Sequence, residues 1–275
     1  MTSTITRSDN LEQFRKQLQP SLNSGLNLTD VEYADGEWIG VFNEGRASAW
    51  NYNDNLAGLK SQIKARWEDD YELVDIEYGN GIWFATFEEG ISSNSAYIHN
   101  PDYDGFTGQI TQEGDRGGYR GHDLYDVAYG DGVWFGVLDD ELGGSTYSRS
   151  TTNTLAADIN RVQGEDYDLV GIEYTGEDWI SVFHDPTGVV DSTYAIGSSQ
   201  EQFNQQISEK LNLGYDLIDI EYGEGLWVGV FDGVVASTGT SDNSTPTTND
   251  VLVDSVVQGA LLENTHFAFD PDHYF

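Results

Sequence analysis

The chain has 275 residues, and its 48 acidic side chains outnumber 12 basic ones, which gives a formal net charge of −36. Because such a surface repels nucleic-acid phosphates and anionic membranes, we expect neither as a partner. The chain has no cysteine, which excludes disulfides, thiolate chemistry and cysteine-ligated zinc, and no apolar run reaches the roughly 20 residues that span a bilayer.

Two explanations fit the acidic composition. A surface adapted to concentrated salt is rich in carboxylates and poor in lysine, because screening removes the self-repulsion. A protein that collects divalent cations also needs carboxylate oxygens. The acids are spread along the whole chain, which favours the salt-tolerant, halophilic-type surface. The polar N-terminus, MTSTITRSDN, lacks the apolar stretch of a signal peptide, so a cytoplasmic location is favoured over an extracellular one.

The chain opens with a predicted polar strand and helix in TSTITRSDNLEQFRKQL, and a hairpin phrase then recurs five times. In the second copy, residues 71–78 alternate as a half-buried strand does, which places Leu73, Asp75 and Glu77 on one face and Val74, Ile76 and Tyr78 on the other. The sequence GNG then suits a tight turn. The predicted hairpins lie near 26–43, 71–90, 122–139, 167–184 and 215–232.

Each hairpin carries a tyrosine and, five residues later, a tryptophan. This fixed offset in all five copies is the strongest pattern in the sequence. Large aromatic side chains beside a turn are expected to anchor the hairpin against its neighbours. The predicted structural anchors are Tyr33, Trp38, Tyr78, Trp83, Tyr129, Trp134, Tyr174, Trp179, Tyr222 and Trp227.

A polar third strand and an amphipathic helix follow the hairpins, so the sequence predicts an α+β repeat protein of five strand–strand–strand–helix units of about 45–50 residues. Such units must stack to cover their apolar faces. We favour a propeller-like closed toroid, with the first strand completing the last blade, over an open repeat array. The repeats are expected to occupy 1–243, and 244–275 a linker, a C-terminal helix and an aromatic tail.

The phrase ARWEDDYELVDIEYGNGIWFATFEEG at 65–90 resembles tandem Trp- and Gly-Tyr-containing repeats of uncharacterised function that are appended to some bacterial and plant protein kinases. In those repeats too, a Trp-bearing helix precedes an aromatic residue, a strand, a Gly-rich turn and a returning strand. The resemblance implies an accessory, non-catalytic binding module. The present chain is far more acidic and carries no kinase domain in these residues, so no functional residue is transferred from the resemblance.

Three hairpins carry paired carboxylates two residues apart, which places both members of a pair on one strand face. The pairs are Asp30 with Glu32, Asp75 with Glu77, and Asp219 with Glu221. We favour a solvated outer face for them, followed by cation binding and then by catalysis, because active sites rarely occur in copies. A carboxylate-based hydrolase would require acids of adjacent repeats to converge on a central axis.

One segment partly matches a calcium-binding loop. Asn100, Asp102 and Asp104 occupy positions 1, 3 and 5 of that pattern, but position 12 is Thr111 rather than glutamate. We therefore favour a surface turn and keep Ca²⁺ as the alternative. Exposed residues of the third strands are the predicted ligand contacts, namely Trp50, Tyr97, His99, Tyr147 and Tyr194.

No catalytic residue is predicted. The Gly-x-Gly elements precede strands rather than helices, which favours hairpin turns over phosphate-binding loops, and the five histidines are scattered. We expect a non-enzymatic, acidic repeat scaffold that binds a protein partner and needs no cofactor. The alternative is a multivalent extracellular protein that binds carbohydrate or calcium.

Overall fold

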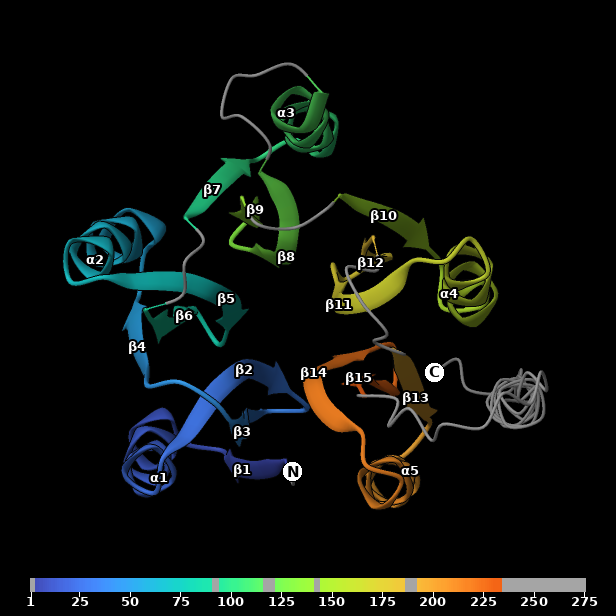
Figure 1. The fold of residues 1–275 in the computed structure, drawn as a ribbon, viewed down its shortest axis with the longest axis horizontal. Coiled ribbons are helices and arrows are strands. Elements are labelled where there is room, and N and C mark those ends of the chain that lie inside the picture. Colours follow the sequence, from blue (N-terminus) through green and yellow to red (C-terminus); the bar gives the residue numbers. More distant parts are fainter. Residues whose placement is uncertain (1–2, 91–93, 116–121, 141–143, 186–191, 234–275) are drawn as a thin grey trace, which may run out of the picture.

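The computed structural model describes residues 3–90, 94–115, 122–140, 144–185 and 192–233, with the side chains of 111–115 left aside. These residues form five three-stranded antiparallel sheets, each with one helix, as predicted for a repeat protein. Figure 1 shows the five units placed around a common centre with their helices outermost. The expected linker, helix and aromatic tail at 244–275 lie outside the described residues.

Each sheet has an inner, a middle and an outer strand, named by distance from the common centre (Figure 1). The inner strands are β2 (Leu26–Ala34), β5 (Tyr71–Gly79), β8 (Asp123–Gly130), β11 (Asp168–Tyr174) and β14 (Asp216–Gly223). The middle strands are β3 (Glu37–Glu44), β6 (Ile82–Glu89), β9 (Val133–Asp139), β12 (Trp179–His184) and β15 (Leu226–Asp232). The outer strands are β1 (Thr4–Ser8), β4 (Ser48–Asn53), β7 (Ser95–Asn100), β10 (Ser145–Ser150) and β13 (Thr193–Gly197). The helices are α1 (Leu11–Asn23), α2 (Leu56–Glu68), α3 (Tyr103–Asp115), α4 (Leu155–Gln163) and α5 (Gln200–Asn212).

The chain enters every unit by its outer strand, and this order corrects the predicted phasing of the repeat. In the first unit, β1 pairs with β3, and α1 then carries the chain across the sheet to β2. The first strand therefore belongs to the hairpin that follows it and does not complete the last unit. Helix α1 causes this order, because it buries Phe14 and Leu18 against the sheet of its own unit. The chain therefore returns to that same sheet after the helix.

Tight two-residue turns connect four of the five hairpins. Asn80 and Gly81 have φ values of 48° and 79°, the left-handed conformations that a hairpin turn of this length requires. The same conformations occur at Asp35–Gly36, Asp131–Gly132 and Glu224–Gly225. The fourth hairpin turns instead through residues 175–178, where Thr175 accepts and donates hydrogen bonds with Asp178.

Every inner strand contains a β-bulge at the same position. In β5 the register shifts between Leu73 and Asp75, which leaves Val74 as the extra residue opposite Phe87 and Thr86. Leu73 consequently shares a face with Ile76 and Tyr78, not with Asp75 and Glu77 as strict alternation predicted. The equivalent shifts lie between Leu28/Asp30, Leu124/Asp126, Leu169/Gly171 and Leu217/Asp219.

The hydrophobic core of the described residues consists of five clusters, each of which lies between one unit and the next. The cluster around Leu59 and Ile63 of α2, for example, joins Leu73 of the second unit to Phe135 of the third. The cluster around Phe203 of α5 joins the fifth unit to Ile39 and Val41 of the first. A single unit therefore leaves apolar surface that only a neighbour covers, and this arrangement brings the inner strands together.

Candidate functional site

Eight carboxyl groups of the inner strands converge on the centre of the five units. They line a small cavity of about 10 Å³ together with valine and isoleucine residues of the same strands. Four strands provide an aspartate, with Gly171 in the fifth, and four provide a glutamate, with Ala128 in the fifth. These axis carboxyls are Asp30, Asp75, Asp126, Asp219, Glu32, Glu77, Glu173 and Glu221.

The burial of these groups corrects the predicted solvated outer face. Glu32 is 4% exposed, Asp75 8% and Glu221 5%, while Asp126 and Asp219 are half-buried. The bulge explains the difference, because it turns the leucine that precedes each bulge toward the helix. The acids that follow are left on the face that meets the neighbouring unit.

Each axis aspartate accepts a hydrogen bond from the backbone of a neighbouring inner strand. Val31 N–H donates to Asp75 Oδ2 at 3.2 Å, and Ile76 N–H donates to Asp126 Oδ2 at 3.1 Å. The same bond links Ile172 to Asp219 at 2.6 Å and Ile220 to Asp30 at 3.2 Å. The last of these bonds joins the fifth unit to the first. Neighbouring inner strands belong to separate sheets and are not paired backbone to backbone, so the aspartate side chains serve as acceptors for these amide groups.

Two axis glutamates make the equivalent contact one step nearer the hairpin turns. Tyr33 N–H donates to Glu77 Oε1 at 3.3 Å, and Tyr129 N–H donates to Glu173 Oε1 at 2.7 Å. The side chain of Glu32 also lies within hydrogen-bonding reach of those of Glu221 and Glu77. Such a contact between two carboxyl groups becomes a hydrogen bond only when one of them carries a proton.

Burial and mutual repulsion raise the pKa of the axis carboxyls. For Glu77, burial is the largest cause of the rise, and the pKa reaches about 8. Backbone hydrogen bonds to its carboxylate lower the pKa but do not offset the effect of burial. Burial likewise raises the pKa of Asp126 to about 7, again against backbone hydrogen bonds. For Asp30, Asp75, Glu32 and Glu221, burial is followed by the negative charge of neighbouring axis carboxyls. Among the described residues that line the cavity there is no lysine, arginine or histidine.

The candidate calcium residues form the start of a helix. Asp102 Oδ2 accepts a hydrogen bond from Gly105 N–H at 2.8 Å, and Asn100 Oδ1 accepts one from Asp102 N–H at 2.9 Å. Asp104 lies in the first turn of α3. These are the contacts of an N-terminal cap, and among the described residues no group of three His, Asp or Glu side chains is arranged to hold a metal ion. Calcium binding at this segment stays a prediction.

The predicted ligand residues lie against helices of the preceding units. Tyr97 stacks on Trp67 of α2 at 5.7 Å, and His99 Nε2 lies 2.8 Å from Lys60 Nζ. Tyr194 is 8% exposed, and its hydroxyl donates to Asn160 of α4. Trp50 and Tyr147 are half-buried in two further clusters between units. Only Tyr97 and His99 are neighbours, so the structure does not unite the five residues in one exposed site.

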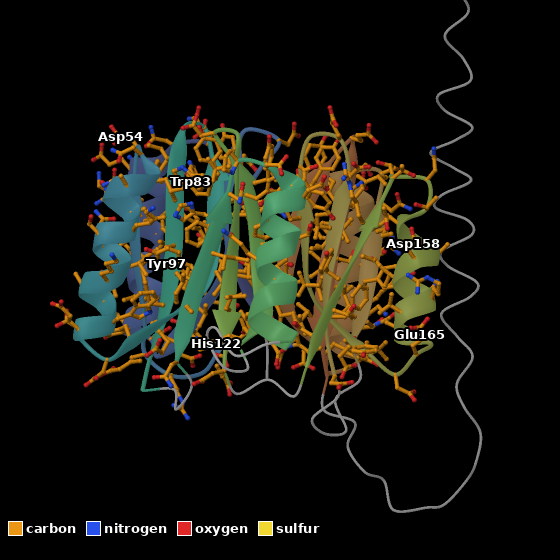
Figure 2. The ribbon with its side chains drawn as sticks, turned by 90° about the horizontal axis from the view of Figure 1, so that it is seen from above. Asp54, Trp83, Tyr97, His122, Asp158 and Glu165 are labelled. Carbon is orange, nitrogen blue, oxygen red and sulfur yellow. The ribbon has the colours of Figure 1, made fainter. Side chains whose placement is uncertain are left out.

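The tyrosine and tryptophan of each hairpin pack on each other. All five tryptophans are buried, and the distances between the ring centroids of the two residues are 5.0, 4.8, 4.8, 5.0 and 4.7 Å along the chain. Figure 2 shows Trp83 near the end of the molecule that also carries Asp54 at the start of α2. This packing is what a structural anchor requires.

A serine at or just before the start of each outer strand forms a link that the sequence analysis missed. Its Oγ accepts a hydrogen bond from the leucine N–H that precedes the bulge in the neighbouring unit, at 2.8–2.9 Å in all five cases. The serines are Ser48, Ser95, Ser145, Ser192 and Ser3, bonded to Leu28, Leu73, Leu124, Leu169 and Leu217. The signal was present, because each serine lies two residues before Trp50, Tyr97, Tyr147, Tyr194 or Ile5.

Comparison of the chain with known protein families and with curated proteins gives no match. Within the described part of the chain, no helix is both long enough and apolar enough to cross a bilayer.

Proposed function

We propose that this chain is a non-enzymatic, acidic repeat scaffold that binds a protein partner, and that its five units form a propeller-like closed toroid in solution. The contacts of β14 with β2 and the cluster between α5 and the first unit support the toroid. The proposal agrees with the accessory, non-catalytic role that the resemblance to kinase-associated repeats implies.

The size and bonding of the central cavity carry the proposal. Converging carboxyls are what a hydrolase would need, but six of these eight accept backbone hydrogen bonds that link neighbouring units. A cavity of about 10 Å³ has room for about one water molecule and none for a sugar or a peptide. We therefore assign the axis a structural role and place partner binding on the outer surface.

The exposed hairpin turns offer a surface for such a partner. Asp35, Asp131 and Glu224 are exposed at equivalent positions of three turns. Gly79, Gly130 and Gly223, each directly before a turn, lie against the tyrosine that precedes the turn of the neighbouring unit. The turns of neighbouring units, and with them these carboxylates, therefore lie at one end of the molecule. A negatively charged end of this kind suits a partner with a basic surface and accelerates their encounter.

Two charge-matched variants test the proposal. The first carries Asp35→Asn, Asp131→Asn and Glu224→Gln, and the control carries Glu68→Gln, Glu165→Gln and Glu209→Gln at exposed positions on or beside three helices. Peptides are selected from a random-sequence display library with the full chain in about 0.15 M potassium chloride, where the screening length is about 8 Å, and their affinity is then measured for both variants. We expect basic peptides whose affinity falls in the first variant alone.

The competing functions make different predictions in the same experiment. Equal loss of affinity in both variants would mean general charge attraction and would contradict a binding surface at the turns. Selective binding on a glycan array, abolished by a chelator and restored by calcium, would favour the carbohydrate- or calcium-binding alternative. Hydrolysis of any glycan or peptide probe would contradict the non-enzymatic assignment.

A further inference from the structure

The contacts between inner strands depend on side chains whose charge changes with pH. The strands β2, β5, β8, β11 and β14 lie next to each other around the centre (Figure 1). The hydrogen bonds that join them at the level of the axis aspartates run from a backbone N–H of one strand to a carboxyl of the next. The carboxyls therefore connect the five units at the place where the units come closest.

Full ionisation of this cluster would leave its negative charges without compensation. The groups that face the cavity are the axis carboxyls of the five inner strands, and the middle strand β6 adds the neutral Thr86, which donates to Asp75 at 3.4 Å. Beside the bulge, Tyr125, which is 37% exposed, adds a phenol whose pKa is raised by partial desolvation and by nearby acids that include Glu88, Asp126, Asp139 and Asp75. No cation of the described chain lines the cavity. Buried like charges without a counter-ion disfavour the folded state strongly.

The glutamates of three units lie close enough together for their side chains to share protons. Glu32 of the first unit lies beside Glu221 of the fifth unit and Glu77 of the second. Two ionised carboxylates at such a contact repel each other, whereas a proton on one of them allows a hydrogen bond. Ionisation of both partners would therefore place repulsive contacts at the junctions between units.

We propose that the axis carboxyls form a proton-dependent clasp, which holds the five inner strands together while the cluster retains protons and weakens the junctions between units when the cluster ionises. The clasp is a conformational device built into the fold, and it is independent of which partner the outer surface binds.

The direction of the pH dependence follows from the raised pKa values. The pKa of Glu77 rises from 4.5 to about 8 and that of Asp126 from 3.8 to about 7. The folded chain therefore holds protons that the unfolded chain releases, so these groups stabilise the fold fully below about pH 4. Their contribution is lost as the pH rises through 7 to 8.

Chemical unfolding of the chelator-treated full chain, at several pH values between about 5 and 9 and at constant potassium chloride, measures this effect. We expect the unfolding constant to rise with pH by up to about tenfold per pH unit for each clasp carboxyl that ionises on unfolding. The variants Glu77→Gln and Asp126→Asn keep an amide oxygen as acceptor and remove one ionisation each, so each should make the rise less steep. The control Asp54→Asn changes an exposed acid by the same charge and should keep the wild-type dependence.

A second measurement needs no variant. In the wild-type chain, amide hydrogen exchange at Val31, Ile76 and Ile220, after correction for the intrinsic effect of pH, should accelerate above pH 7 because these amides bond to axis carboxyls. The clasp would be contradicted by a pH dependence that the axis and control variants share equally, or by unchanged protection of the three amides. Loss of stability on chelation at pH 6 would also overturn the clasp, since a metal ion rather than protons would then neutralise the cluster.

Discussion

The residue before three of the five turns is a glycine that allows neighbouring units to approach closely. A Cβ atom at Gly79 would overlap the side chain of Tyr33, and the same holds for Gly130 with Tyr78 and for Gly223 with Tyr174. Tyr33 also packs on Trp38, so the anchor pair of one hairpin rests on the backbone of the next. These glycines are therefore fixed by contact between units, whereas the sequence pattern indicated only a turn.

Substitution of Gly79 by alanine should test this contact. We expect Gly79→Ala to lower the free energy of unfolding by about 1–3 kcal/mol, the usual cost of an added methyl group in a packed site, in urea or guanidinium unfolding. The control Gly108→Ala lies in α3, where a Cβ would have no neighbour within 4 Å, and should be neutral or stabilising by up to about 1 kcal/mol. Equal effects of the two substitutions would contradict the role assigned to Gly79.

The serine at the start of an outer strand has a comparable role. Ser48→Ala would leave the Leu28 N–H, now bonded to Ser48 Oγ at 2.8 Å, without a partner. We expect a loss of about 1–3 kcal/mol in the free energy of unfolding. Ser61→Ala, on the exposed side of α2, provides the comparison and should stay within about 0.5 kcal/mol of wild type. A neutral Ser48→Ala would show that the link is dispensable.

At the scale of the secondary-structure elements, the strands and helices could be predicted but the faces of the inner strands could not. Alternation and helical periodicity are local patterns, and they indicated the hairpins and the helix of each unit. A bulge leaves no clear trace in sequence, because Val74 reads as an ordinary member of an alternating strand. One extra residue exchanges the faces of Leu73 and its neighbours, and the acids were therefore assigned to the wrong environment.

The start of α3 offers a prediction at this scale. Because Asp102 caps the helix, Asp102→Ala should lower the free energy of unfolding by about 1 kcal/mol, while Asp102→Asn should retain most of the cap. Thermal or chemical unfolding with and without millimolar calcium measures both. If segment 100–111 bound calcium, the effect of Asp102→Ala would instead grow when calcium is added.

For the whole molecule, the net charge of −36 predicts a marked response to monovalent salt. We expect the thermal midpoint of unfolding to rise as potassium chloride increases from about 0.1 M to 1 M, because the screening length falls from about 10 Å to 3 Å and repulsion between exposed acids weakens. Calcium at constant ionic strength should add nothing further. A midpoint that is independent of monovalent salt would contradict the salt-tolerant interpretation of the surface.

The candidate site belongs to this scale, which explains why the sequence alone could not locate it. Asp30 and Ile220 are far apart along the chain and form a hydrogen bond only because the fifth unit lies beside the first. The paired spacing correctly implied that Asp75 and Glu77 share a face. Which surface covers that face depends on how five units pack together, and no single repeat contains that information.

The contiguity of each unit has a consequence for how such a chain can evolve. One uninterrupted stretch supplies an outer strand, a helix and a hairpin. It also supplies the serine, the carboxyls and, in three of the units, the glycine that meet the neighbours on both sides. Tandem duplication of the corresponding segment of a gene would therefore insert a finished building block with two compatible joints, and loss of the segment would remove one. Gly171 and Ala128, which interrupt the two series of acids, are then marks of divergence among copies that began alike.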